Sequence, residues 1–171
     1  VVLVYNSDAV SGWLYTVENN VGDLEKASYV TATGGTITTS GDFKIHTFLG
    51  DGTFTVSDAG NSAGSNTVDY LVIAGGGGGG GQLGGGGGAG GYRESFPNPA
   101  TGGLSVTAQA YPIAVGGGGN PGPQGHAGGT GAVSTFSTIT SAGGGFGGRG
   151  PSTGGDGGSG GGGYHAGAGG S

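Results

Sequence analysis

Three glycine tracts occupy the second half of this chain, and each follows a run of residues typical of a β-strand. The tracts cover residues 75–91, 116–131 and 143–170 and hold 40 of the 51 glycines. The run before the first tract, TVDYLVIA at residues 67–74, is rich in the β-branched and aromatic residues that strands prefer. This arrangement predicts a β module that projects long loops with almost no side chains.

The tracts are expected to be packed rather than disordered. Charged residues make up only 8% of the chain, whereas disordered segments usually carry a high charge. A glycine chain can form a left-handed helix of the polyproline-II type, with three residues per turn and backbone groups free to bond sideways. Collagen is excluded because no strict Gly-X-Y period runs through the tracts. We therefore predict polyglycine-II helices that lie side by side.

These helices are expected to fold back wherever other residues interrupt the glycines. The predicted fold-back points are Gln82-Leu83, Ala89, Asn120–Gln124 and Pro151–Thr153. The glycines predicted to carry this packing are Gly75, Gly78, Gly81, Gly86, Gly117, Gly144 and Gly161.

The rest of the chain reads as all-β, a small antiparallel β-sandwich or sheet module. Short strands are expected at Val1–Tyr5, Gly12–Val17, Thr36–Thr39, Asp42–Leu49, Thr53–Val56, Val68–Ala74, Leu104–Ala110, Tyr111–Val115 and Val133–Ile139. Gly50-Asp51-Gly52 suits a tight hairpin between Phe48 and Phe54. The strand Val68–Ala74 is expected to be central, and the two strands on either side of Ala110 are expected to pair. The predicted core is Val72, Ile73, Val106, Ile113, Phe136 and Ile139.

Charge and hydropathy exclude two classes of partner. The formal net charge is −6, and the only basic side chains are Lys26, Lys44, Arg93 and Arg149. Nucleic-acid binding needs clustered Lys and Arg, so that partner is not expected. No run of 18 large apolar residues is present, so membrane insertion is not expected. The chain has no Cys, which removes disulfides and thiolate metal sites.

Three segments resemble the glycine-rich module of tailed-bacteriophage fibres and tip adhesins. They are TGGTITTSGDFKIHTF at residues 33–48, GTFTV at 52–56 and VDYLVIAGGGGGGG at 68–81. The resemblance covers residues 33–171 and implies a role on the surface of a virion, in its structure or in receptor binding. Residues 1–32 would then be the end of an upstream fibre segment or attachment strands, joined to another fibre or virion protein. The resemblance carries over no catalytic residues.

Catalytic and metal-binding motifs are not convincing in this sequence. Matches to G-x-G-x-x-G mean nothing inside polyglycine, because no helix and no acidic ribose partner follows them. His46 is interpreted as a packing residue on a strand, while His126 and His165 lie far apart in glycine-rich loops. We therefore expect no enzymatic activity, no cofactor and no metal.

The remaining functional signal is a set of aromatic and polar residues among the glycines. Such side chains would stand out from a flat glycine surface, and Tyr and Arg are favoured in binding hot spots. The predicted receptor-binding residues are Tyr92, Arg93, Phe96, Phe146, Arg149, Tyr164 and His165. The alternative is that these residues fill gaps between glycine helices.

Three functions agree with these observations. The first is a fibre or adhesin module that binds a host glycan or protein; the second is a purely structural fibre, spike or decoration protein. The third is a cellular extracellular glycine-rich adhesin. The predicted core is small for the chain length, and Val1, Val2, Val4, Trp13 and Leu14 are apolar. A homotrimer that buries these residues is therefore expected.

Overall fold

The computed structural model describes residues 3–5, 13–15, 26–95 and 103–171, the first two segments by their backbone alone. In these residues all regular structure is β, as the sequence predicts, and every strand pair is antiparallel. The strands are β1 (Leu3–Tyr5), β2 (Trp13–Tyr15), β3 (Thr31–Thr33), β4 (Thr36–Ser40), β5 (Phe43–Thr47), β6 (Gly52–Asp58), β7 (Thr67–Val68), β8 (Leu71–Ile73), β9 (Tyr92–Glu94), β10 (Leu104–Ser105), β11 (Ala110–Ala114), β12 (Ser134–Phe136) and β13 (Ile139–Ser141).

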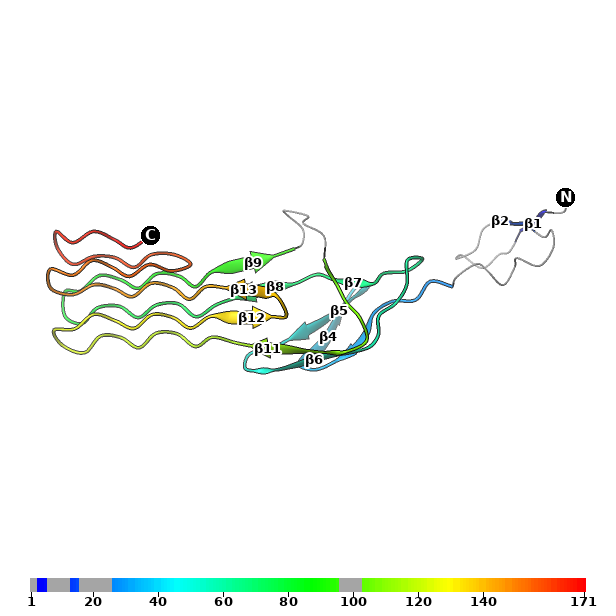
Figure 1. Ribbon diagram of the computed structural model, residues 1–171, viewed down its shortest axis with the longest axis horizontal. Helices are drawn as coiled ribbons and strands as arrows, with labels where there is room; N and C mark the ends of the chain where they lie inside the picture. The colour runs from blue at the N-terminus through cyan, green and yellow to red at the C-terminus, as the bar shows by residue number, and fades with distance from the viewer. Residues whose placement is uncertain (1–2, 6–12, 16–25, 96–102) are drawn as a thin grey trace.

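A five-stranded sheet forms the base of the molecule, in the order β13-β12-β11-β6-β3. Four two-stranded ribbons accompany it: β1-β2, β4-β5, β7-β10 and β8-β9. The β8-β9 ribbon contacts β12 and β13 of the sheet. The arrangement is sandwich-like, and Figure 1 shows it at one end of an elongated glycine layer.

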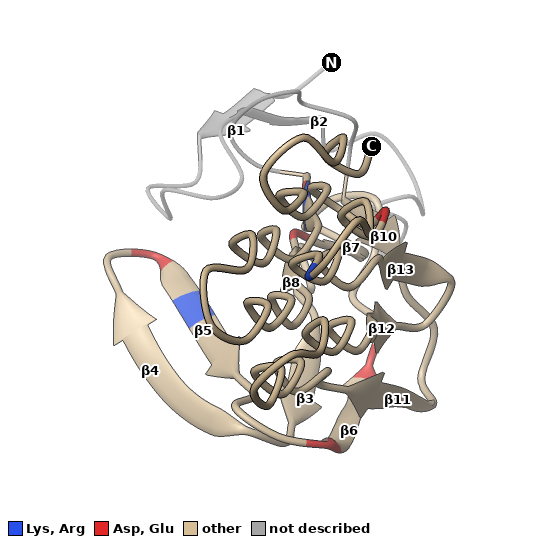
Figure 2. Ribbon diagram, turned by 90° about the vertical axis from the view of Figure 1, so that its left-hand side faces the viewer, with Lys and Arg blue, Asp and Glu red and all other residues tan. Residues whose placement is uncertain are grey.

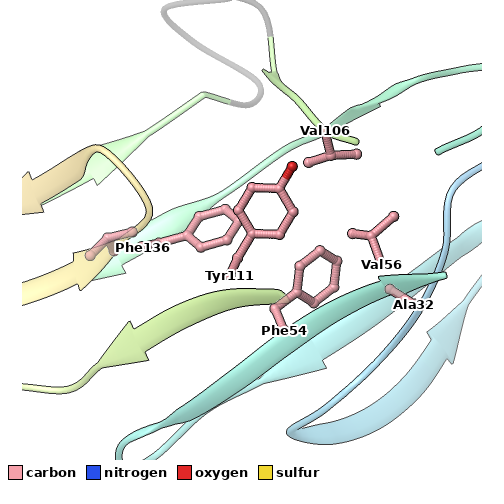
Figure 3. Close-up of a cluster of buried hydrophobic side chains, with 7 residues drawn as sticks. Ala32, Phe54, Val56, Val106, Tyr111 and Phe136 are labelled. Carbon is pink, nitrogen blue, oxygen red and sulfur yellow. The ribbon is translucent and has the colours of Figure 1, made fainter. Parts of the chain in front are cut away.

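The core lies between the sheet and the ribbons. Phe54 on β6 packs against the rings of Tyr111 and Phe136, with centroids 6.4 and 5.9 Å away (Figure 3). The buried cluster consists of Ala32, Phe54, Val56, Val72, Val106, Tyr111 and Phe136. Of the predicted core, Val72, Val106 and Phe136 are buried, and Ile113 and Ile139 are partly buried against the cluster. The prediction is wrong for Ile73, which is 54% exposed.

The predicted hairpin between Phe48 and Phe54 is also wrong, because β5 pairs only with β4 and β6 joins the main sheet. The Phe48 ring gives a physical reason why the chain leaves the β4-β5 ribbon here and enters the main sheet. A Cβ on Gly35 would lie 3.1 Å from that ring, and a Cβ on Gly52 would lie equally close. The ring therefore fills the space left by these glycines. Asp51 does not form part of a hairpin turn. Its carboxylate instead accepts the Val115 N–H at 2.9 Å, at the end of β11.

Two further strand predictions need correction. The expected central strand Val68–Ala74 divides into β7 and β8. The break lies at Asp69 and Tyr70, where the Ser95 hydroxyl donates to Asp69 and accepts the Tyr70 N–H. Strands β10 and β11 do not pair with each other: β10 pairs with β7, and β11 pairs with β6 and β12. Strand β9, which directly follows the first tract, is not among the strands expected from the sequence.

The three glycine tracts form eight extended arms that lie side by side (Figure 1). They leave the ends of β8, β11 and β13, and two of the tracts return to β9 and β12. We number them arm 1 (75–81), arm 2 (84–91), arm 3 (116–122), arm 4 (127–133), arm 5 (143–149), arm 6 (152–156), arm 7 (160–163) and arm 8 (167–171). Figure 2 shows the arms end on.

Hydrogen bonds between arms repeat every three residues. In arm 1, the N–H groups of Gly75, Gly78 and Gly81 donate to arm 4 or the turn before it, while those of Gly77 and Gly80 donate to arm 2. The carbonyls of arm 1 accept from arms 3 and 5. Among the described tract glycines only Gly125 and Gly150 have positive φ, so the arms share one hand. The predicted polyglycine-II packing is confirmed, because a three-residue period belongs to this helix.

At most positions of the arms the packing leaves no room for a Cβ atom. Residues three apart in one arm face the same way, and we call such a set a row. A Cβ on Gly75, Gly78, Gly81, Gly144 or Gly161 would lie closer than 3.0 Å to a backbone carbonyl of another arm or turn. Gly86 and Gly117 take part in the packing through carbonyls that accept a hydrogen bond from another arm, but nothing lies within 4 Å of an added Cβ at either position. These two positions face outward.

Other outward rows carry the side chains of the tracts. Non-glycine residues recur three apart at 127, 130 and 133, at 153, 156 and 159, and at 165, 168 and 171, and all but Ala127 are exposed. Arm 1 lies between arms 2, 3, 4 and 5 and is all glycine. Residue choice in the tracts thus follows the position of each row in the bundle.

Gly117→Ala and Gly86→Ala are each expected to raise the free energy of unfolding by about 0.4–1 kcal/mol, because alanine restricts the unfolded chain without meeting a neighbour. Gly119→Ala, in the same arm as Gly117, is the matched control. Its Cβ would lie 2.9 Å from the Gly78 nitrogen, so it should destabilise. Urea denaturation measures all three, and equal effects at Gly117 and Gly119 would contradict the assigned rows.

The fold-back points agree with the prediction at three of four places. Turns occur at 81–83, at 124–125 and at 150–151, within two residues of the interruptions noted above. Ala89 is the exception: it lies within arm 2, and its carbonyl accepts the Ser159 N–H at 3.0 Å. The bends at 157–159 and 164–166 were not predicted.

Candidate functional site

Four turns meet at the end of the glycine layer that is farthest from the sheet (Figure 1). They join arms 1 and 2, arms 3 and 4, arms 5 and 6, and arms 7 and 8. We call them the distal turns; they comprise residues 81–83, 123–126, 149–152 and 164–166. The bonded arms hold each turn at its base, so the turns form one surface on a rigid support.

The first two distal turns touch through their side chains. The Gln124 side-chain amide donates to the Gln82 side-chain oxygen at 3.2 Å. Gln82 and Leu83 have positive φ, and Gly125 supplies a third left-handed residue. The carbonyl of His126 accepts the Gly81 N–H at 2.9 Å. A strained, side-chain-bearing backbone is therefore held in place at this corner.

The other two distal turns meet around Tyr164. The Arg149 guanidinium carbon lies 4.6 Å from the centroid of the Tyr164 ring, and the His165 ring is 5.9 Å away on the adjacent residue. His165 has a φ of 50°, a conformation that non-glycine residues seldom adopt. An open depression of about 360 Å³ lies here, lined by Gly150, Pro151, Tyr164, His165, Ala166 and Gly167.

Arg149 anchors this corner. Its Nε is buried and has no hydrogen-bond partner among the described residues. A guanidinium above a tyrosine face gains about 0.5–1 kcal/mol at an exposed site. This stacking fixes the Tyr164 ring beside the depression. The site thus offers an oriented aromatic ring, an imidazole and a guanidinium, which are groups that bind polar or cyclic surface ligands.

The structure brings together only some of the predicted receptor-binding residues. Arg149, Tyr164 and His165 meet at the distal turns. Tyr92 and Arg93 lie on β9 beside the sheet, at the opposite end of the arms. The chain re-enters a strand directly after arm 2, so the structure does not bring these two residues to the distal turns. Phe96 lies outside the described residues.

Phe146 agrees with the alternative interpretation, in which residues of this set fill gaps between glycine helices. It is half-buried within arm 5, and a Cβ on Gly155 of arm 6 would lie closer than 3.0 Å to its ring. The ring therefore fills a gap between arms, as expected for a packing residue.

Four residues of the distal turns were missing from the predicted site: Gln82, Leu83, Gln124 and His126. Leu83 is 82% exposed. The signal was present, because Gln82 and Leu83 are the only non-glycine residues between 75 and 88. In the sequence these two residues predict a fold-back, and in the structure the same residues also form part of the distal surface.

Three titratable groups have shifted pKa values. A hydrogen bond from its hydroxyl to Glu94 raises the pKa of Tyr92, and the neighbouring negative charge adds to the shift. The Ser171 N–H donates to Asp156 at 2.7 Å and lowers the pKa of that carboxyl. The pKa of Tyr111 is lowered by its hydrogen bonds with Thr107. Hydrogen bonding is the largest cause in each case.

Charged residues are sparse on the glycine layer seen end on (Figure 2). Within the described residues, no group of three His, Asp or Glu side chains could hold a metal ion. His46 packs as predicted, with its Nδ1 2.8 Å from the Gly34 carbonyl oxygen and its ring against Phe54. Over the same part of the chain, no helix long and apolar enough to cross a membrane occurs.

Comparison with known proteins adds one finding. A family model described as "Glycine-rich domain" matches residues 47–171. No curated protein and no solved structure matches the chain significantly.

Proposed function

The chain belongs to the glycine-rich domain family, and from this premise we propose that it is a non-enzymatic recognition module of a tailed-bacteriophage fibre. In this proposal the glycine layer is a rigid spacer. It carries the distal turns away from the sheet and presents them to a host-cell surface, while the sheet end faces the rest of the particle. The site of action would be the outside of the virion.

The observation that carries the proposal is the position of the tract side chains. Eight arms with few side chains converge on turns where Gln82, Gln124, Arg149, Tyr164 and His165 are gathered. A support held by repeated hydrogen bonds loses little entropy when its tip binds a ligand, and preorganisation of this kind favours affinity. Variation of the turns would change the ligand without changing the arms.

The distal turns can be tested by binding to cells. The variant Arg149→Ala/Tyr164→Ala/His165→Ala should bind at least about tenfold more weakly, because it removes the stacked pair and the ring beside it. The measurement is the binding of fluorescently labelled chain to a panel of bacterial strains that the parent binds. Tyr29→Ala is the matched control, since Tyr29 is 66% exposed at the sheet end. Equal loss in both variants, or unchanged binding by the triple variant, would contradict the proposal.

The main alternative is a purely structural fibre, spike or decoration protein. The regular packing of the arms favours it as much as an adhesin, because both uses need a stiff rod. The two differ at the distal turns: a structural protein would assemble normally and show no cell binding that depends on Arg149, Tyr164 and His165.

A further inference from the structure

The depression beside Tyr164 has walls and a local charge that suit one class of ligand. Its lining combines the Tyr164 ring and an imidazole with the compact residues Gly150, Pro151, Ala166 and Gly167. We propose that it binds an acidic sugar, a pyranose that bears a carboxylate or a phosphate, at the end or on a side branch of a bacterial surface glycan. This specificity rests on the proposed function, because it names the ligand of the same distal turns.

The walls of the depression suit a sugar ring. Its volume of about 360 Å³ lies within the range of about 300–1,000 Å³ found for small-ligand sites. A pyranose has apolar C–H faces and polar edges, so it fits a site in which a flat aromatic face is surrounded by polar groups. The depression is open, which suits the terminal unit of a glycan.

The aromatic wall is held in place before any ligand binds. The Arg149 guanidinium carbon lies 4.6 Å from the centroid of the Tyr164 ring, and the His165 ring lies 5.9 Å from it. The turn itself is closed, since the Tyr164 carbonyl accepts the Gly167 N–H at 2.6 Å. A ring fixed in this way loses little side-chain entropy when a sugar stacks on it.

The backbone of the two turns can bind the polar edge of a sugar. Gly150, His165 and Ala166 line the depression. Within the described residues, neither the N–H nor the C=O group of any of the three forms a hydrogen bond. These turns therefore offer donors and acceptors together. Sugar hydroxyls need both, because each hydroxyl donates one hydrogen bond and accepts others.

The charge at the distal turns is positive, whereas the chain as a whole has a formal net charge of −6. The turns contain Arg149, His126 and His165 and no acidic residue. The only acidic residue of the glycine arms is Asp156, four residues after Ser152 in arm 6. That separation is about 12 Å at the rise of this helix, longer than the Debye length of about 8 Å at physiological salt. The Arg149 charge therefore attracts an anionic group on a sugar that stacks beside it.

These features together distinguish an acidic sugar from simpler ligands. A free phosphate would use the positive charge but not the aromatic wall. A neutral sugar would use the wall and the backbone groups but not the charge. An acidic sugar uses all three.

Nuclear magnetic resonance titration of the full chain with small probes tests this chemistry without cells. The first probe is trigalacturonate, and its methyl ester is the control that keeps the sugar and loses the charge. The second probe is glucose 6-phosphate, with glucose and inorganic phosphate as controls. At least one acidic sugar should bind about tenfold more tightly than its own controls and shift the amide resonances of Gly150, His165, Ala166 and Gly167. The probe that does so identifies the anionic group. If neither probe exceeds its controls, or if the shifts lie away from the depression, the proposal is overturned.

Substitution of arginine tests the origin of the preference for acidic sugars. Arg149→Gln is expected to abolish the preference over the neutral control, whereas Arg149→Lys should keep most of it, because Lys retains the positive charge. Arg93→Gln is the matched control on β9 at the sheet end and should leave the preference unchanged. The amide resonances of Gly144 and Gly145 in arm 5 report whether each variant is folded. Full preference in Arg149→Gln, or equal loss in Arg93→Gln, would contradict the proposal.

The parent protein provides a test that needs no variant. Raising the salt concentration from about 0.05 to 0.5 M should weaken binding of the acidic sugar and leave binding of its neutral control unchanged, because salt screens the charge and not the stacking. Equal effects of salt on the two would contradict the proposal.

Cell binding separates failure of this specificity from failure of the proposed function. If the chain binds cells through Arg149 and Tyr164 but binds neither acidic sugar, the recognition role stands and the specificity is wrong, as expected for a protein receptor. If an acidic sugar binds at the depression and no cell does, the specificity stands and the recognition role is wrong.

Discussion

Gly78→Val is expected to lower the free energy of unfolding by about 2–6 kcal/mol, a large part of the stability of a small domain. Gly78 donates to Gly129 and accepts from Gly147, both at 2.8 Å, so it ties arm 1 to arms 4 and 5. Any Cβ here would lie 2.7 Å from the Gly119 carbonyl oxygen in arm 3. Valine therefore forces three arms apart, and each buried group left unpaired costs about 1–3 kcal/mol.

The control for this variant is Gly86→Val in the same tract. Gly86 has no atom within 4 Å of an added Cβ, so its substitution should change stability by less than about 1 kcal/mol. Guanidinium denaturation followed by far-ultraviolet circular dichroism measures both. If Gly78→Val were as stable as Gly86→Val, the arms would not be packed as described.

Phe54→Ala is expected to cost about 3–5 kcal/mol, the usual range for a buried aromatic side chain. The Phe54 ring packs against three others, those of His46, Tyr111 and Phe136, at centroid distances of 5.1, 6.4 and 5.9 Å. It is 7% exposed and lies on β6, which pairs with β3 on one side and β11 on the other. Its loss would leave a cavity where the β4-β5 ribbon and the sheet meet.

Phe43→Ala is the matched control, because Phe43 is 62% exposed on the β4-β5 ribbon. A thermal melt followed by intrinsic tyrosine fluorescence should show a much lower midpoint for Phe54→Ala and a small change for Phe43→Ala. Equal shifts would contradict the core assignment. The Phe54 variant also reports on coupling: loss of the arms together with the sheet would show that the two parts unfold as one unit.

The glycine tracts and their helix type could be predicted because polyglycine leaves few ways to pack. A chain without Cβ atoms must satisfy its backbone groups against other backbone, and the three-residue helix allows this on all sides. The order of the β-strands was harder to predict from the sequence. Phe48 and Asp51 show why: a ring that fills the space of two glycines and a carboxylate that bonds to Val115 send the chain into another sheet, and neither contact leaves a local pattern.

The neighbours of each arm could not be predicted either. A glycine gives no sequence signal for the arm that its backbone contacts. Gly86 and Gly78 therefore look alike in the sequence, although an added Cβ would meet open space at Gly86 and another arm at Gly78. One signal does exist at this level. Thr130 and Val133, like Thr153 and Asp156, stand three residues apart on outward rows, and this spacing marks the rows that tolerate side chains.

The candidate site was partly predictable for the same reason. Arg149, Tyr164 and His165 interrupt the third tract and do lie at distal turns. Phe146 interrupts the same tract yet fills a gap between arms 5 and 6. Phe146 precedes Arg149 by three residues, which is one turn of this helix. The sequence alone therefore does not distinguish a residue at the distal turns from one within the glycine layer. The position of Tyr92 could not be predicted either, because it depends on the pairing of β9 with β8 after arm 2.

Amide hydrogen exchange in arm 5 tests the polyglycine-II layer most directly. Arm 5 bonds to arms 1, 2, 4, 6 and 7, and its donors occur in pairs separated by one unbonded N–H. NMR detection should find slow exchange at Gly144, Gly145, Gly147 and Gly148. Fast exchange is expected at Phe146 and Arg149, whose N–H groups form no hydrogen bond among the described residues. Uniformly fast exchange, or protection at every second residue as in a β-strand, would contradict the account.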